Sequence, residues 1–505
     1  MKKVISMVAL SLLCAVGAKG EMKSSISQYG ITWTFDKSYE CGQFVNGDWW
    51  VKGPAVVQSV NPAPSGGRHG SMIDPRTGFQ SYDDRVNGYA ITMLAKFPAT
   101  LQPDQSLVSA ISFTSFGCTM RGGQGEGYGY DLNGVCKDDS KIKTAAVLTC
   151  VAEAKSANTF RPQFSKTLQG VPKKYYTTDQ INTDLIPSLA PVTGIPTDLT
   201  YYLRGLERPW IMHNTDWGAR ALHPMENMLG YHKYVYGFAA GASVLLLVDL
   251  PAAAKTTLIH RYIQLGIDKY GMCLSGHGSS AMVKVPVIIA GLLLGDTEMA
   301  NFEKNGISKT PFRTDWMTYY RHEAESNIKS SKIASNAFYH GFDVGWRQDP
   351  GCAEHEHLDP TEWDLIETTG CLSGGGSKRE TYRGINSPQW PGLALTTLFF
   401  GAKELYDHPA FFDYSDRWKD GENKSTGNEF IDNMWAAYRD KVPAQTGIIK
   451  NREPVTVDRI EITGDTFYSI EGKTITGKRM RNGVYLYPRT TKDGRCLLER
   501  FVFVK

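Results

Sequence analysis

The residues with the clearest chemical potential surround a histidine–asparagine pair. His213 and Asn214 lie between two tryptophans in the run WIMHNTDW (210–217), and Arg220 follows shortly after. An asparagine amide can donate a hydrogen bond to a carboxylate, and a histidine can donate or accept one. A neutralised carboxylate makes the proton on the neighbouring carbon easier to remove. The group therefore suits proton abstraction from a sugar acid, with Trp217 and Arg220 binding substrate. The alternative interpretation is a structural turn before a helix.

A second group pairs a cation with a tyrosine. Arg313 and Tyr320 are seven residues apart in the run PFRTDWMTYYRH. Seven residues make almost two turns of a helix, so a continuous helix would place both on one face. A cation beside a tyrosine favours the phenolate. We expect Tyr320 to take the proton and Arg313 to assist it. Ordinary packing is the alternative.

A third group follows in the run ETYRGIN (380–386). Tyr382 is a second candidate for the catalytic acid or base, and Arg383 and Asn386 are candidate sugar- or carboxylate-binding residues. Trp390 offers an aromatic surface for a sugar ring. His277 stands between two glycines and is a candidate binding residue on an exposed loop. A structural role is the alternative for each of them.

Other chemistries find less support. The run CAEHEH (352–357) carries His355 and His357 but no third metal ligand at a fixed spacing, so we predict no metal and no cofactor. No G-x-S-x-G motif indicates a serine esterase. A glycoside hydrolase would need two carboxylates, for which the candidates are Glu354, Glu356 and Asp364.

The elements that must position these residues change along the chain. Residues 21–140 are rich in turn residues and short strand-like runs such as 31–35 and 56–60, which predicts an irregular β and loop region. Residues 141–442 contain recurring apolar or amphipathic segments, which predict a mostly α catalytic domain, an (α/α) toroid. The predicted helices are 143–155, 179–189, 225–250, 253–270, 281–294, 314–324 and 393–405. Residues 443–505 alternate in polarity, which predicts a small C-terminal all-β domain.

The chain begins like an exported protein. Lys2 and Lys3 precede a short apolar run that ends in small residues, so we predict a signal peptide over 1–20 and a secreted protein. That run and the apolar stretch 238–250 are too short to span a bilayer. The formal net charge is +3, and three of the lysines lie in the signal peptide. A nearly neutral mature chain disfavours nucleic acid as a partner.

Four runs carry a family resemblance: GDWWVKGP (47–54), GHGSS with VPVIIAGLLLGD (276–296), EHLDPTEWD (356–364) and DHPAFFDYSDRW (407–418). They resemble exported bacterial proteins of polysaccharide lyase family 38, which implies cleavage of alginate or glucuronan on an (α/α) barrel. The C-terminal residues resemble the sorting domains of type IX secretion.

Together these features predict a secreted lyase that cleaves a uronic-acid polysaccharide by β-elimination, with alginate the first candidate and glucuronan the second. The expected partner is this anionic polysaccharide. Two alternatives remain open: a glycoside hydrolase on a similar toroid, and a glycan-binding protein without catalytic activity.

Overall fold

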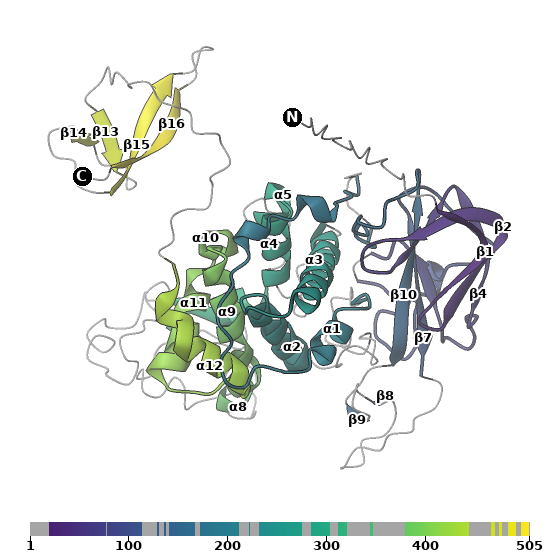
Figure 1. The fold of residues 1–505 in the computed structure, drawn as a ribbon, viewed down its shortest axis with the longest axis horizontal. Coiled ribbons are helices and arrows are strands. Elements are labelled where there is room, and N and C mark those ends of the chain that lie inside the picture. The colour runs from purple at the N-terminus through teal and green to yellow at the C-terminus, as the bar shows by residue number, and fades with distance from the viewer. Residues whose placement is uncertain are drawn as a thin grey trace, which may run out of the picture. The chain divides into compact units, whose positions relative to one another are not determined.

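The computed structural model divides the chain into two compact units, Met1–Thr446 and Gly447–Lys505, and each is described by itself (Figure 1). The structure describes residues 20–76, 78–113, 129–130, 136–137, 141–166, 172–211, 222, 232–274, 284–302, 312–320, 344–346, 379–443, 466–469, 474–476, 483–490 and 496–503.

The first unit begins with a nearly closed, mixed β-barrel. The strand order is β5-β7-β10-β3-β2-β4-β6, and β1 pairs with β2. β10 pairs with β3 in parallel, whereas the other pairs are antiparallel. A hydrogen bond from the Ala95 amide to the Ser71 carbonyl (2.8 Å) joins β5 to the segment that leads into β6, the strand at the other end of the sheet. The strands are β1 (Glu21–Gln28), β2 (Ile31–Gln43), β3 (Trp49–Lys52), β4 (Ala55–Asn61), β5 (Ser71–Ile73), β6 (Ala99–Leu101), β7 (Ser106–Ser112) and β10 (Ile142–Val151).

The barrel forms because its strands alternate between an inner and an outer face. In β2, Ile31, Trp33 and Phe35 are buried in the interior while Thr34 between them is exposed. β10 differs, since Leu148 points into the barrel and Val147 packs with the helices. Figure 1 shows β10 on the side of the barrel that faces the helices. The barrel and the helices therefore share one wall.

The predicted mostly α toroid is wrong, because the N-terminal part of the chain is this barrel. The largest local error is the predicted helix 143–155, which is strand β10. A strand buried on both faces shows a continuous apolar run without alternation, and such a run cannot be told from a buried helix by periodicity. The predicted helix 179–189 is also wrong, because only two short 3-10 turns form there, Thr178–Gln180 and Thr183–Leu185.

A helical body follows the barrel in the same unit. α3 packs against α4, and α2 packs against α9. A large apolar cluster that includes Val108 and Val147 of the barrel fills the space between the elements. The described helices are α1 (Thr200–Gly205), α2 (His232–Leu245), α3 (Ala252–Leu274), α4 (Lys284–Leu293), α5 (Thr297–Ala300), α6 (Arg313–Met317), α8 (Arg379–Asn386), α9 (Trp390–Phe399), α10 (Lys403–Tyr406), α11 (Pro409–Asp416) and α12 (Glu429–Tyr438). None of them combines the length and the apolar character that a membrane span requires.

Short strand pairs complete the description of the first unit. They are β8 (Gly129–Tyr130) with β9 (Cys136–Lys137), and β11 (Thr318–Tyr320) with β12 (Val344–Trp346).

The second unit contains a four-stranded antiparallel sheet in the order β14-β13-β15-β16. Its strands are β13 (Thr466–Ser469), β14 (Thr474–Thr476), β15 (Gly483–Thr490) and β16 (Cys496–Phe503). The alternating runs at 483–487 and 500–503 form strands, as their period of two predicts. The alternating run 455–462 lies outside the described residues.

Candidate functional site

A cavity of about 660 Å³ opens on the helical body and is the candidate site. Its wall comes from α1, α2, α8, the 3-10 turn η9 (Ser387–Gln389), residue Trp418 and the segment that leads into α12. The lining residues are Tyr201, Tyr202, Gly237, Phe238, Gly384, Ile385, Pro388, Gln389, Trp418, Ser425, Thr426, Gly427, Asn428 and Ile431. Segments far apart in the sequence therefore build one concave surface, as in most ligand sites.

One wall of the cavity is aromatic. Tyr201 and Tyr202 begin α1, and their rings meet edge to face with centroids 5.1 Å apart. Phe238 of α2 lies against both rings, at 5.4 Å from each. Burial raises the pKa of the Tyr202 hydroxyl, although a hydrogen bond with the Asn428 side chain opposes that shift. Tyr202 is therefore a neutral hydroxyl at physiological pH.

A second wall is polar and belongs to the segment 422–428, of which residues 425–428 line the cavity. Asp432 of α12 holds this segment in place. The Asp432 carboxylate accepts hydrogen bonds from Lys419 Nζ (2.6 Å), Ser425 Oγ (2.6 Å) and the Thr426 amide (2.9 Å). Burial would raise the pKa of Asp432, but these hydrogen bonds hold it below its ordinary value. Asn428 caps α12 by accepting from the amides at its start. This wall presents ordered hydroxyl, amide and backbone groups.

Trp418 enters the cavity wall from an unusual turn. α11 continues into a π-helical turn, η10 (Arg417–Gly421), which contains Trp418. Single π turns recur at functional sites in proteins. Two cations lie over the Trp418 ring, with Arg383 Cζ 4.9 Å and Lys424 Nζ 5.0 Å from its centroid. Cations held on an indole ring gain cation–π stabilisation and fix its position.

A buried ionic cluster lies behind Trp418. Arg383 forms a two-pronged ion pair with Glu422, and Arg417 Nε lies 2.8 Å from Glu422 Oε1. Burial would raise the pKa of Glu422, but the charges of Arg417 and Arg383 lower it to about 2. Arg383 also donates to the Tyr414 hydroxyl (2.9 Å). The cluster ties α8 to η10 and so fixes two sides of the cavity.

Arg383, Asn386 and Trp390 are described in full, and each is buried. Arg383 is 1% exposed in the ionic cluster, and Trp390 packs against the rings of Phe411 and Tyr414. Asn386 is 7% exposed at the end of α8. None of the three lines the cavity, but they support residues that do. Tyr382 lies on α8, two residues before Gly384 of the lining, and only its backbone is described.

The prediction that Arg313 and Tyr320 share one face of a helix is wrong. α6 begins at Arg313 but ends at Met317, because Thr318 adopts an extended conformation (φ −113°, ψ 139°). Tyr320 belongs to strand β11 and pairs with Val344 of β12. The two residues therefore do not share a helical face. The side chains of Arg313 and Tyr320 are not among those described.

The remaining site predictions fall outside the described residues. This holds for His213, Asn214, Trp217, Arg220, His277, Glu354, His355, Glu356, His357 and Asp364. Within the described parts of the chain, no group of three or more His, Cys, Asp or Glu residues could hold a metal ion.

An arginine does meet a tyrosine hydroxyl in this body, but the pair is Arg383 with Tyr414. Tyr414 is fully buried, and burial raises the pKa of its hydroxyl in spite of the arginine. The sequence argument for a tyrosine activated by a neighbouring cation thus omitted desolvation, which is the stronger effect here. Tyr414 is a structural hydrogen-bonding residue.

The sequence analysis missed Tyr201, Asn428 and Trp418 as site residues. Trp418 lies in the run DHPAFFDYSDRW, and its neighbours in the polar segment 419–428 could have drawn attention to it. Tyr201 carries no such signal, since only the fold brings α1 beside residues 418–428.

The described lining can bind a ligand that has both apolar faces and hydroxyl groups. The two carboxylates beside it, Glu422 and Asp432, are bonded to cations or hydroxyl and amide donors, so both serve the architecture. Comparison with known protein families, with curated proteins and with solved structures finds no match to this chain.

Proposed function

We propose that the protein is a secreted polysaccharide lyase that cleaves a uronic-acid polymer by β-elimination, with alginate the first candidate and glucuronan the second. The observation that carries the proposal is the cavity of about 660 Å³, whose lining combines an aromatic wall with a polar one. A sugar ring has apolar C–H faces and hydroxyl groups around its edge, so both walls match its chemistry. The predicted signal peptide supports a secreted protein, and the resemblance to polysaccharide lyases supports β-elimination as the reaction.

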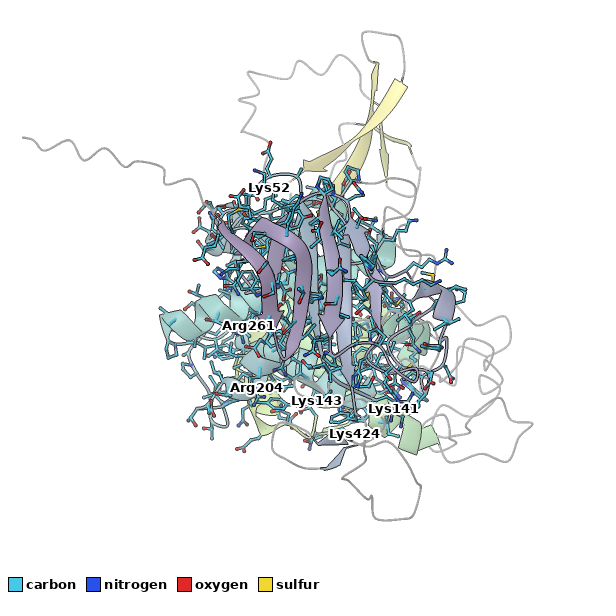
Figure 2. The ribbon with its side chains drawn as sticks, turned by 90° about the vertical axis from the view of Figure 1, so that its right-hand side faces the viewer. Lys52, Lys141, Lys143, Arg204, Arg261 and Lys424 are labelled. Atoms are coloured by element: carbon cyan, nitrogen blue, oxygen red, sulfur yellow. The ribbon has the colours of Figure 1, made fainter. Side chains whose placement is uncertain are left out.

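The charge around the cavity supports an anionic substrate. Arg204 lies on α1, one turn from Tyr201, and Lys424 directly precedes the lining residue Ser425. Figure 2 shows Arg204, Lys424 and Lys143 toward the lower end of its view. Lys143 belongs to β10 of the barrel and does not line the cavity, and Lys424 Nζ lies 3.0 Å from Glu422 Oε2. A cation close to a binding site attracts an anionic polymer and raises its rate of encounter.

The proposed reaction needs a group that neutralises the carboxylate and a group that moves a proton. His213 and Asn214 would bind the substrate carboxylate. A tyrosine would take the C5 proton, the bond from C4 to the bridging oxygen would break, and a C4–C5 double bond would form. The leaving oxygen would receive a proton from the same or a second tyrosine. Tyr320 and Tyr382 are the candidates, and the position of Tyr382 on α8 beside the cavity lining supports it.

The direct test is incubation of the purified full chain with alginate and glucuronan, followed by absorbance of the unsaturated product. We expect absorbance to rise with at least one polymer, and no rise with any uronate polymer would overturn the proposal. Cleavage without unsaturation would identify a glycoside hydrolase instead. Binding without cleavage would identify a glycan-binding protein.

Two variants test which tyrosine takes the C5 proton. Tyr382→Phe and Tyr320→Phe each remove one hydroxyl and leave the ring in place. The variant that loses nearly all turnover while binding persists identifies the tyrosine that transfers the proton. If both variants keep wild-type turnover, neither tyrosine is the base.

A further inference from the structure

One aromatic side chain of the cavity is held open to solvent. Tyr201 is 38% exposed, whereas its partners Tyr202 and Phe238 are 6% and 5% exposed. The other large apolar side chains that are exposed in the described parts of the chain, Met22, Phe79 and Ile91, do not line the cavity. An exposed aromatic ring on a concave surface can stack on the apolar face of a ligand.

The orientation of the Tyr201 ring is fixed. Its plane makes angles of 82° with Tyr202 and 63° with Phe238, at centroid separations of 5.1 and 5.4 Å. Two nearly perpendicular contacts restrain the ring far more than one would. A ring already ordered in the free protein loses little conformational entropy when a ligand stacks on it.

Two glycines mark open space in the same cavity. A Cβ atom built on Gly384 or on Gly427 would meet no other atom within 4 Å. Gly384 lies on α8, and Gly427 lies between Thr426 and Asn428 of the polar wall. Both are exposed, so a ligand can approach the backbone closely there.

We propose that Tyr201 is the stacking platform of a sugar-binding subsite, in which a pyranose ring lies on Tyr201 and fills the space beside Gly384 and Gly427. The ring would direct its hydroxyl groups toward the Ser425–Asn428 wall. This inference rests on the proposed function for its ligand class, a polysaccharide. It assigns to Tyr201 a binding role that needs the ring and not the hydroxyl.

The test measures affinity of the full chain for a uronate oligosaccharide and for a neutral glucan oligosaccharide. We expect Tyr201→Ala to weaken binding of whichever oligosaccharide the wild type binds by roughly tenfold, and to raise KM with little change in kcat. Tyr201→Phe keeps the ring and should bind within about twofold of wild type. Equal binding by wild type and Tyr201→Ala would overturn the inference.

A steric variant gives an independent test without touching the platform. Gly384→Leu should fold, because the Cβ position is open and Gly384 has no left-handed φ, but its side chain would extend into the cavity that Tyr201 also lines. We expect it to weaken binding as much as Tyr201→Ala does, whereas Gly384→Ala should bind nearly as wild type. Wild-type binding by Gly384→Leu would contradict the subsite.

These experiments test the sugar-binding subsite and the proposed lyase activity separately. A wild-type protein that makes no unsaturated product, yet binds an oligosaccharide through Tyr201, would refute the lyase and keep the subsite. A protein that cleaves a uronate polymer equally well with Tyr201→Ala would keep the lyase and refute the subsite. Absence of any oligosaccharide binding by the wild type would refute the subsite.

Discussion

The barrel and the helical body of the first unit have chemically different interiors. The barrel encloses an apolar cluster that includes Trp33, Phe35 and Val57, with the Trp33 indole bonded to Ser109 (3.0 Å). The helical body encloses a larger apolar cluster and, within it, charged side chains such as Arg383 and Arg417. Burying a charge costs free energy unless it is paired and hydrogen-bonded. The buried charges of Arg383 and Arg417 therefore have to be compensated within the helical body, and Glu422 supplies that compensation.

Buried charges within the helical body also differ from one another. Asp268 of α3 pairs with Arg161 (2.6 Å), which also binds Asp48 (2.5 Å) between β2 and β3. The next residue, Lys269, is fully buried, and its amine lies 3.9 Å from Met272 Sδ and 5.3 Å from the Trp210 ring centroid. Among the described residues, no oxygen atom lies within hydrogen-bonding distance of this amine. One helix thus carries Asp268, which forms a direct ion pair, next to Lys269, whose amine lies close to a sulfur atom and an aromatic ring.

Removal of Arg161 should have the largest effect, because it leaves two buried carboxylates without their cation. We expect Arg161→Met to lower the free energy of unfolding by about 3–5 kcal/mol. Chemical denaturation of the full chain would measure the loss. Lys96→Met, at an exposed position, is the control and should change stability by less than about 0.5 kcal/mol. A similarly small loss for Arg161→Met would mean that the stability of the fold does not depend on the ion pairs of Arg161 with Asp48 and Asp268.

Glu422 tests the ionic cluster beneath the cavity. Glu422→Gln leaves Arg383 and Arg417 without a shared carboxylate, and we expect a loss of about 3 kcal/mol. Because the pKa of Glu422 falls from an ordinary 4.5 to about 2 in the folded protein, its contribution is present above pH 4.5 and is lost as the pH falls toward 2. Unfolding measured across this window should therefore show a steeper acid loss for wild type than for the variant. Parallel curves would contradict the assignment.

Replacement of Lys269 tests the buried amine, and it should raise the free energy of unfolding, whereas the two preceding variants lower it. Burial lowers the pKa of its amine to about 8 from an ordinary 10.5. The unfolded chain therefore binds more protons between pH 8 and 10.5, so wild-type stability should gain a rising contribution from Lys269 across that window. Lys269→Met should be more stable than wild type at pH 7 by about 3 kcal/mol. The variant should also lack the rise in stability between pH 8 and 10.5 that Lys269 gives the wild type. A variant less stable than wild type would show that the amine has a stabilising partner.

Asp432 should give the smallest effect of the four, because it orders an exposed segment and not the core. Asp432→Asn weakens the bonds to Lys419 and Ser425, and we expect a loss of about 1 kcal/mol. Limited proteolysis should cleave the 422–428 segment faster in the variant. Asp184→Asn, at an exposed position, is the control and should be cleaved at the wild-type rate. Unchanged cleavage in Asp432→Asn would show that the segment is ordered by other contacts.

The sequence by itself determined the elements whose side-chain pattern is local. The runs 31–35 and 56–60 lie in strands β2 and β4, and the predicted helices 253–270 and 281–294 correspond to α3 and α4. Alternating burial in a half-buried strand and a long apolar helical pattern are visible within one segment. Such patterns need no knowledge of the neighbouring elements.

Only the tertiary structure decided which apolar runs became strands and which residues met at the cavity. β10 lacks alternation because the barrel covers one face and the helices cover the other, so its identity depends on both neighbours. The cavity joins Tyr201 of α1 to Trp418 and Asn428, whose separation in sequence leaves no spacing to recognise. The i to i+7 argument for Arg313 and Tyr320 failed for the same reason, since pairing with β12 took Tyr320 into a strand. Long-range packing outweighs local propensity wherever both faces of an element are covered.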